Sequence, residues 1–445
     1  MANKKNEDKI ICSFCGEDYT DNPEVSVLES SSDPSLHICE KCLEKGFHLI
    51  QKSSEEILDI ENEEPKENLT PIQIKEFLDQ YVIGQEKAKQ ILSVATYNHM
   101  KLLEHYDNCQ DDSVELQKAN VLMVGATGSG KTYLIQTLAK LFDVPYAICD
   151  STALTASGYV GADVESVLQK LIINADGDIK RAERGIVFID EIDKKASPNV
   201  ESSSITRDVS GMDVQQALLK LIEGSVVDVP TSGRRLNPEG KNIQIDTSKI
   251  LFIVGGAFPG IEKIIKKRLN YKDKGSIGGF LIDDKDNKEN KKAEYNEIID
   301  KVTHEDFKNF GLIPEFLGRL PIICPLKELT EDEMCRILTE PKNALIKQYQ
   351  ALMEYDNIEL DFDKQAIRAI AKKALDNKTG ARGLRSIMED VLLDVMYTAP
   401  DKVKAANHKC TLKITEKCIT DNVKPELVVK KNRGGNPLND AKFVF

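Results

Sequence analysis

Short apolar runs bounded by glycine, proline or polar residues occur through the middle of the chain, whereas apolar residues at helical spacing dominate its last third. Apolar runs of this length are typical of buried strands. They predict strands over residues 120–124, 145–150, 185–190 and 250–254. Helical spacing predicts helices over residues 72–103 with a break at 81–85, 133–142, 214–222, 331–355, 364–375 and 380–397. Polar stretches at 194–210, 263–274 and 283–292 are predicted to be solvated loops.

A glycine-rich segment, Gly125-Ala126-Thr127-Gly128-Ser129-Gly130-Lys131-Thr132, lies between the first of these strands and the helix that follows it. It fits the pattern G-x-x-x-x-G-K-[ST] at every fixed position. Its glycines let backbone N–H groups point inward, and the start of the next helix adds partial positive charge. We therefore expect a nucleoside triphosphate here, with Lys131 on the outer phosphates and Thr132 on magnesium.

Two adjacent carboxylates, Asp190 and Glu191, end the apolar run that starts at Gly185. A strand ending in acids is the expected second half of a phosphate-loop site. We expect Asp190 to hold magnesium, directly or through water, and Glu191 to polarise the water that attacks the γ-phosphate.

Four of the ten cysteines form two C-x-x-C pairs near the N-terminus, Cys12 with Cys15 and Cys39 with Cys42. Two such pairs predict a tetrahedral zinc site, and so short a segment has little core without a metal. A redox pair is the alternative, although redox C-x-x-C motifs are rarely doubled. His37 lies close to Cys39, but four cysteines already complete the tetrahedron.

Length and charge restrict the class of protein. The 445 residues suffice for two or three domains, and 41% hydrophobic with 30% charged residues is ordinary for a globular chain. The net charge of −13 argues against a broad nucleic-acid interface. The start MANKKNEDKI lacks a signal-peptide core, and no run approaches the roughly 18 apolar residues of a spanning helix. We expect a cytoplasmic protein that contacts neither membrane nor nucleic acid.

The order and spacing of several further motifs indicate a family. The motifs are YVIGQ (81–85), GATGSGKT (125–132), GYVG (158–161), VFIDEID (187–193), SITRDVSG (204–211), LIPEFLGRLP (312–321) and GARGLRS (380–386). Together with the doubled C-x-x-C, they resemble the ClpX family, the AAA+ unfoldases of the Clp protease, over nearly the whole chain.

The resemblance implies an α/β fold: an AAA+ P-loop NTPase large domain with a parallel sheet, a small, mainly helical C-terminal domain and an N-terminal zinc-binding module. The expected segments are the zinc module (1–50), an acidic linker (51–68), the large domain (69–325), the small domain (326–429) and a polar tail (430–445).

The resemblance also implies roles for individual residues. Val82 and Ile83 would flank the adenine, and the nucleotide would contact the chain from Gly125 to Tyr133. Arg319 would be an arginine finger that reaches the nucleotide of a neighbouring subunit, and Arg382 would report nucleotide state to the small domain. A planar, permanently charged guanidinium suits both roles.

Substrate and peptidase contacts are implied as well. The segment Gly158-Tyr159-Val160-Gly161 would, by itself, be a surface turn, but the resemblance places it in an axial channel that grips polypeptide. Arg234 and Arg235 would lie at the mouth of the channel, and the 194–210 loop would also face substrate. The segment Ile277-Gly278-Gly279-Phe280 would dock a ClpP-type peptidase.

Three positions depart from the family pattern. The basic turn reads Arg234-Arg235-Leu236 where the family has Arg-Lys-His, and the docking segment is one glycine longer than Ile-Gly-Phe. The strand ending at Val254-Gly255-Gly256 lacks the polar tip that many AAA+ proteins use as a sensor, as is normal for this family.

The predicted function is that of a hexameric, ATP- and magnesium-dependent unfoldase, which recognises tagged substrates and adaptors, unfolds the substrates and feeds a ClpP-type peptidase. The zinc module would serve dimerisation and recruitment. A remodelling chaperone of the same fold that works without a peptidase is the alternative. The related unfoldase HslU lacks the zinc module, and a zinc-ribbon regulator of nucleic acid conflicts with the acidic charge. A GTP switch would need N-K-x-D, whereas Asn377-Lys378 is followed by Thr379-Gly380.

Overall fold

The structure, a computed structural model, consists of two units, Met1–Lys66 and Glu67–Phe445, which we describe separately. It describes residues 12–15, 18, 27–29, 36–43, 69–108, 116–155, 162–197, 209–229, 243–271, 284–406, 410–429 and 442–444. Four predicted segments lie outside the described residues: the linker at 51–68, the channel segment Gly158–Gly161, the basic turn at Arg234 and Arg235, and the docking segment Ile277–Phe280.

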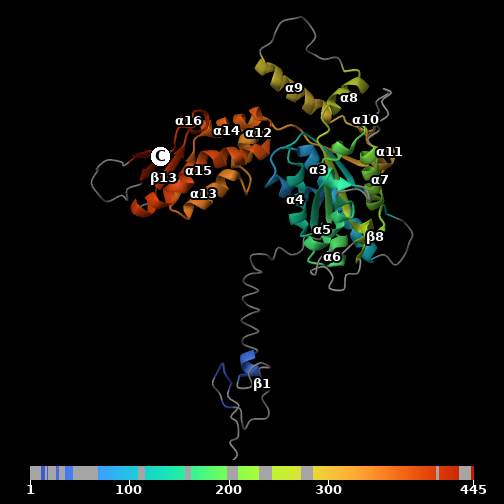
Figure 1. Cartoon of the computed structure of the whole chain (residues 1–445), viewed down its shortest axis with the longest axis horizontal. Coiled ribbons are helices and arrows are strands. Elements are labelled where there is room, and N and C mark those ends of the chain that lie inside the picture. Colours follow the sequence, from blue (N-terminus) through green and yellow to red (C-terminus); the bar gives the residue numbers. More distant parts are fainter. Residues whose placement is uncertain are drawn as a thin grey trace, which may run out of the picture. The chain divides into compact units, whose positions relative to one another are not determined.

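A five-stranded parallel sheet forms the centre of the second unit (Figure 1). In spatial order the strands are β11 (Ile322–Pro325), β3 (Val121–Val124), β10 (Leu251–Gly256), β7 (Ile186–Asp190) and β4 (Tyr146–Asp150). The apolar runs predict four of these correctly, and β11 is the addition. Because all the strands are parallel, the segments that follow β3, β7 and β10 meet at one edge of the sheet, where α/β proteins bind ligands.

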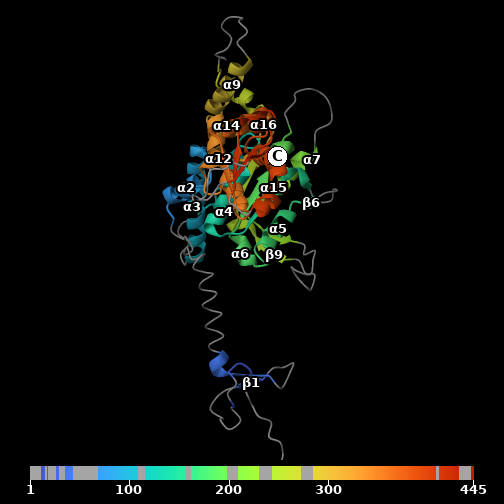
Figure 2. The same cartoon turned by 90° about the vertical axis from the view of Figure 1, so that its left-hand side faces the viewer.

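Alternate residues of the central strands enter different cores. Val121 and Met123 of β3 belong to one apolar cluster and Leu122 and Val124 to another. The first cluster is covered by α2 (Pro71–Asp79), α3 (Glu86–Asn108) and α4 (Lys131–Phe142). The second is covered by α5 (Ser166–Asn174), α6 (Ile179–Glu183), α7 (Val209–Glu223), α8 (Ile261–Arg268), α10 (His304–Phe310) and α11 (Pro314–Gly318). The large domain therefore has three layers, and α3 and α7 lie apart in both views (Figures 1 and 2).

Two stretches that we predicted to be loops are helices. Helix α8 starts the 263–274 stretch, and α9 (Asp284–Ile299) contains nearly all of 283–292. Ile265 and Ile298 are fully buried, and Lys266 pairs with Glu294 at 2.9 Å between the two helices. The prediction was wrong because it took charge as a sign of a loop, although lysine and glutamate are strong helix formers.

Short elements flank the segments that the structure leaves out. Strands β5 (Leu154–Thr155) and β6 (Ala162–Asp163) pair on either side of the channel segment. Strands β8 (Val226–Val229) and β9 (Ile243–Asp246) form a hairpin around the basic turn. Between β7 and α7, the short helix η2 (Ile192–Lys195) begins the predicted 194–210 loop.

The C-terminal part of the second unit has an apolar core of its own. Its helices are α12 (Glu331–Thr339), α13 (Leu345–Glu354), α14 (Lys364–Asp376), α15 (Ala381–Ala406) and α16 (Glu416–Thr420). The prediction of a mainly helical domain is confirmed, although the predicted helix at 331–355 divides into α12 and α13. A mixed sheet was not predicted: β12 (Ile358–Phe362), β13 (Cys410–Ile414), β14 (Glu426–Val429) and β15 (Lys442–Val444). Strand β15 falls in the segment that we predicted to be a loose tail.

The N-terminal unit contains a small hairpin. Strand β1 (Val27–Glu29) pairs antiparallel with β2 (His37–Cys39), and Cys12 forms an isolated bridge with His37. This bridge brings the first C-x-x-C pair next to the second.

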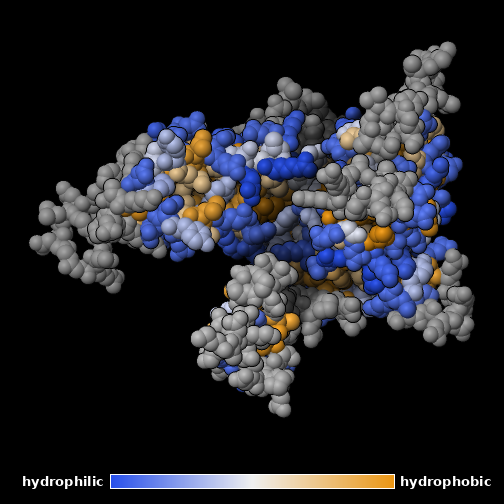
Figure 3. Space-filling model, turned by 60° about the horizontal axis from the view of Figure 1, so that its bottom comes forward, coloured by the Kyte–Doolittle hydropathy of each residue, from blue (hydrophilic) through white to orange (hydrophobic). Residues whose placement is uncertain are grey.

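Hydrophilic residues predominate on the face shown in Figure 3, where apolar residues form separate groups. Among the described helices, none combines the length and the apolar composition that crossing a bilayer requires.

Removing a buried carboxylate should test the packing of α8 on α10. Asp306 is fully buried and accepts hydrogen bonds from Arg268 Nε (2.8 Å), Arg268 Nη2 (2.9 Å) and Thr303 N (2.8 Å). Asp306→Ala should destabilise the large domain by about 3 kcal/mol, because it leaves the guanidinium without its partner. Denaturant unfolding measures the loss. Glu305→Gln, on the exposed side of the same helix, is the control, and equal stability of the two variants would contradict the expectation.

Candidate nucleotide site and metal centre

A cavity of about 830 Å³ opens at the carboxyl edge of the sheet, against the small domain. Its volume lies within the range of small-molecule sites. Most of the predicted nucleotide residues line it: Val82, Ile83, Thr127, Gly128, Ser129, Gly130, Lys131, Thr132, Tyr133, Asp190, Glu191 and Arg382. Gly125 and Ala126 are not among the lining residues. The structure thus gathers residues from four separate motifs around one space.

Lys131 begins α4 and is held against the backbone of the phosphate loop. Its Nζ donates to Gly125 O at 2.8 Å and to Ala126 O at 3.5 Å. Only 7% of the residue is exposed, and burial lowers the pKa of its amine, an effect that nearby Asp190 and Asp193 oppose. A phosphate in the cavity would add further negative charge beside this amine and stabilise its charged form.

Thr132 and Asp190 face the same point of the cavity. Thr132 Oγ1 donates to Asp190 Oδ2 at 3.3 Å, and Asp190 Oδ1 accepts from Glu191 N at 2.9 Å. Glu191 has a φ of 61°, in the left-handed region, and its carbonyl accepts from Ser151 Oγ at 2.8 Å. Hydroxyl and carboxylate oxygens are the ligands that Mg²⁺ prefers, so these two side chains fit the ion, and the unusual backbone turns Glu191 away from the strand.

The glycine tip of β10 makes room for the neighbouring acids. Strand β10 lies between β3 and β7, so its end stands directly between the phosphate loop and Asp190. A Cβ added at Gly255 would lie 2.8 Å from Phe188 Cζ and 3.4 Å from Asp190 Oδ1. One added at Gly256 would lie 2.7 Å from Asp193 Oδ1. A larger side chain at this tip would therefore collide with the acidic side of the site.

The small domain supplies a third of the cavity wall, which the sequence did not predict. The additional lining residues from this domain and its connector are Leu329, Ile337, Pro341, Asn343, Leu345, Gln348 and Arg385. Tyr133 OH is hydrogen-bonded to the Asn343 side chain at 2.8–3.0 Å, across the two domains. Arg385 could have been predicted, because it follows Arg382 by three residues and so shares its helix face.

The large-domain wall also contains residues that we did not predict. Tyr81 precedes the two predicted adenine contacts, and Asp193 follows the acidic pair. Lys194 lines the cavity as well, although the resemblance implied that its loop faces substrate.

The phosphate loop touches the start of α15 directly. Ala381 N donates to Gly128 O at 3.3 Å, and a Cβ at Gly128 would lie 2.8 Å from Thr379 O. Gly128 also has a φ of +81°, which side chains rarely adopt. Gly128 occupies a variable position of the sequence pattern, yet both its backbone conformation and its neighbours require glycine here.

Arg319 lies at the opposite edge of the sheet from the phosphate loop. Its carbonyl accepts from Asn120 Nδ2 at 3.1 Å, and Asn120 precedes β3 whereas the phosphate loop follows it. The four residues of β3 separate the two edges by roughly 13 Å. The guanidinium pairs with Glu223 at 2.9 Å, and its side chain is 55% exposed. Arg319 is not among the residues that line the cavity.

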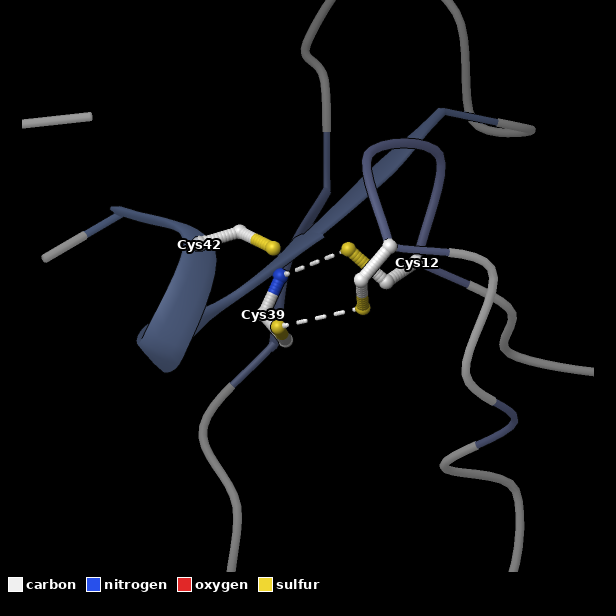
Figure 4. Close-up of side chains that lie close together, drawn as sticks. Cys12, Cys39 and Cys42 are labelled. Carbon is white, nitrogen blue, oxygen red and sulfur yellow. Dashed lines mark hydrogen bonds between the residues drawn. The ribbon is translucent and has the colours of Figure 1, made fainter. Parts of the chain in front are cut away.

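The four predicted cysteine ligands come together in the N-terminal unit (Figure 4). All four sulfurs lie within 4.8 Å of one another, and Cys15 Sγ is 3.8 Å from Cys39 Sγ. Zn–S bonds of about 2.3 Å place the sulfurs of a tetrahedral site about 3.8 Å apart. Hydrogen bonds from the backbone N–H groups of Cys15 and Cys39 lower the pKa of the Cys12 thiol to about 6. The cluster fits a zinc ion, and His37 is not part of it.

Gly128→Ala should weaken nucleotide binding at least tenfold, because the methyl group pushes α15 away from the phosphate loop. Gly177→Ala is the matched control: Gly177 has a φ of +85°, but an added Cβ meets nothing within 4 Å. Both variants have a similar backbone strain of about 1 kcal/mol. Titration with a fluorescent ATP analogue measures the affinities, and equal losses in the two variants would show that the approach of α15 is unimportant.

The cysteine cluster should bind one zinc per chain. Cys15→Ser should lower the zinc content, measured by mass spectrometry of the purified protein, and should make residues 12–43 sensitive to protease. Cys335→Ser, in α12, changes a thiol outside the cluster and should leave the zinc content unchanged. A full zinc content in Cys15→Ser would contradict the assignment of this ligand.

Comparisons with known proteins agree with this geometry. Residues 116–323 match the family described as AAA domain (Cdc48 subfamily), and residues 329–414 match the C-terminal, D2-small domain, of ClpB protein. The chain is 48% identical over 401 residues to the ATP-dependent Clp protease ATP-binding subunit ClpX of Treponema denticola, covering 90% of this chain and 92% of that protein. With its parallel sheet, helical C-terminal domain and cysteine cluster, the chain belongs to the ClpX family of AAA+ ATPases.

Proposed function

We propose that the chain is a cytoplasmic unfoldase, which assembles into a hexameric ring, hydrolyses ATP between subunits and feeds unfolded polypeptide to a ClpP-type peptidase. One observation carries the proposal: the cavity has its phosphate and acidic groups in place, whereas Arg319 lies at the far edge of the sheet. An ATPase built in this way needs a neighbour to complete it.

The residues of the cavity suit magnesium-assisted phosphoryl transfer. The phosphate loop would surround the β- and γ-phosphates, with Lys131 as the neutralising charge. Thr132 and Asp190, whose oxygens are 3.3 Å apart, would hold the magnesium ion, which neutralises the charge that develops on the phosphates. Glu191 would orient the attacking water. Val82 and Ile83 would flank the adenine, and Arg382, at the start of α15, would report the state of the phosphates to the small domain.

Arg319 would act on the nucleotide of the next subunit. Its exposed guanidinium needs only to leave Glu223, and an ion pair this exposed is worth about 1 kcal/mol or less. Sequential hydrolysis around the ring would then move the Tyr159 and Val160 side chains in the channel and draw the substrate inward. Gly158 and Gly161 would allow this movement, while Arg234 and Arg235 would meet the substrate at the channel mouth.

The remaining partners follow from the same proposal. Residues Ile277–Phe280 would contact the peptidase, and the zinc module would dimerise and recruit substrates or adaptors. A reducing cytoplasm would keep the cysteine ligands available for zinc. The extra glycine of the docking segment favours one alternative, a chaperone that remodels proteins without a peptidase.

An unfolding assay tests the proposal. The purified chain should unfold a tagged, stable fluorescent protein in ATP and degrade it when a ClpP-type peptidase is added. Glu191→Gln should bind ATP with near-normal affinity but lose turnover by at least a hundredfold, and unfolding with it. Tyr159→Ala should keep most of the ATP hydrolysis but lose unfolding. Glu104→Gln, on the exposed side of α3, is the control.

The outcomes separate the alternatives. Unfolding without degradation would favour the chaperone. Full ATP turnover by a monomer, unaffected by Arg319→Ala, would refute hydrolysis between subunits. Unfolding that survives Tyr159→Ala would remove the channel residue from its role.

A further inference from the structure

The large and small domains are joined by a short connector, residues 326–330. Leu326 N still donates to Val124 O of the central sheet at 2.7 Å. At the other end, Thr330 caps α12, where its Oγ1 accepts from Glu333 N at 3.2 Å. Only Lys327, Glu328 and Leu329 therefore lie between the last contact with the sheet and the first helix of the small domain.

Two side-chain amides hold consecutive residues of this connector. Gln85 Oε1 accepts from Lys327 N at 2.9 Å, and Gln85 Nε2 donates to Lys327 O at 2.8 Å. Asn296, near the end of α9, treats Glu328 in the same way: its Oδ1 accepts from Glu328 N at 2.7 Å and its Nδ2 donates to Glu328 O at 3.1 Å. Each amide thus satisfies both the donor and the acceptor of one residue, as a neighbouring strand would.

Gln85 differs from Asn296 in one further bond. Its Nε2 also donates to Ser129 O, in the phosphate loop, at 3.2 Å. All three polar hydrogen-bonding positions of the Gln85 amide are therefore used, and all of its partners are backbone atoms. Gln85 is 7% exposed, so water competes little for these bonds, and its φ of 57° is a conformation that non-glycine residues rarely adopt.

We propose that Gln85 is a positioning residue that couples the phosphate loop to the connector, so that nucleotide binding and rotation of the small domain occur together. A carboxamide is a rigid plane. When a triphosphate moves the Ser129 peptide, the Gln85 amide must carry Lys327 with it or break a bond. Asn296 steadies the next residue of the connector without touching the phosphate loop. This inference rests on the proposed function and adds a route from the nucleotide to the domain movement.

Energy transfer between two dyes tests the coupling. One dye is placed at Lys180 of the large domain and the other at Lys417 of the small domain, both exposed, in a Glu191→Gln chain so that bound ATP persists. ATP with magnesium should change the transfer in this parent chain. Gln85→Met, which keeps the length and removes all three bonds, should lose at least half of that change while ATP still binds within about tenfold of the parent affinity.

Two further variants isolate the effect. Asn296→Leu removes the other amide, and it should keep most of the ATP-dependent change. Gln85→Glu retains the bond from Lys327 N but loses both donated bonds, and it should behave like Gln85→Met, which guards against a packing artefact. Denaturant midpoints close to that of the parent confirm that the variants are folded.

The results have distinct meanings. If Gln85→Met and Gln85→Glu keep the full change, or if Asn296→Leu loses as much, the coupling role of Gln85 is wrong. A parent chain that binds ATP without any change in transfer also overturns the inference but leaves an ATP-binding site in place. A parent chain that binds no ATP overturns the proposed function, and this inference with it.

Discussion

The nucleotide cavity depends on the close approach of two backbone segments that are far apart in the sequence. The phosphate loop at Gly128 lies against the start of α15 at Ala381, with a hydrogen bond of 3.3 Å between them. A glycine is needed here because any side chain would meet Thr379. Once this contact is made, the small domain forms a wall of the cavity, and the polar residues of α13 and α15 come within reach of whatever the phosphate loop holds.

The sequence predicts the parts of the site that are determined locally. A phosphate loop is a continuous segment whose glycines, lysine and threonine act through their own backbone and neighbours, so its pattern can be recognised without a fold. The same holds for Asp190 and Glu191 at the end of an apolar strand, and for the paired cysteines. The central strands were predictable because they are buried on both faces, which makes them short apolar runs.

The remaining features depend on contacts between distant residues. Asn343 and Gln348 line the cavity only because the small domain folds back on the large one, and neither lies in a recognisable motif. Helix α9 was missed because only its last turn is apolar, with Ile298 and Ile299 buried in the large domain. The strands of the small sheet were missed because helical spacing elsewhere in that region dominated the pattern.

The tip of β10 bears on which part of the chain can sense a cleaved phosphate. With Gly255 and Gly256 at that position, the strand between the two halves of the site presents only backbone to a ligand. In the proposed motor, the central sheet is then blind to the difference between ATP and ADP, and that discrimination belongs to elements that border the cavity from outside the sheet. The division of labour is mechanical: the sheet is a fixed support, and the helical domain is the part free to respond.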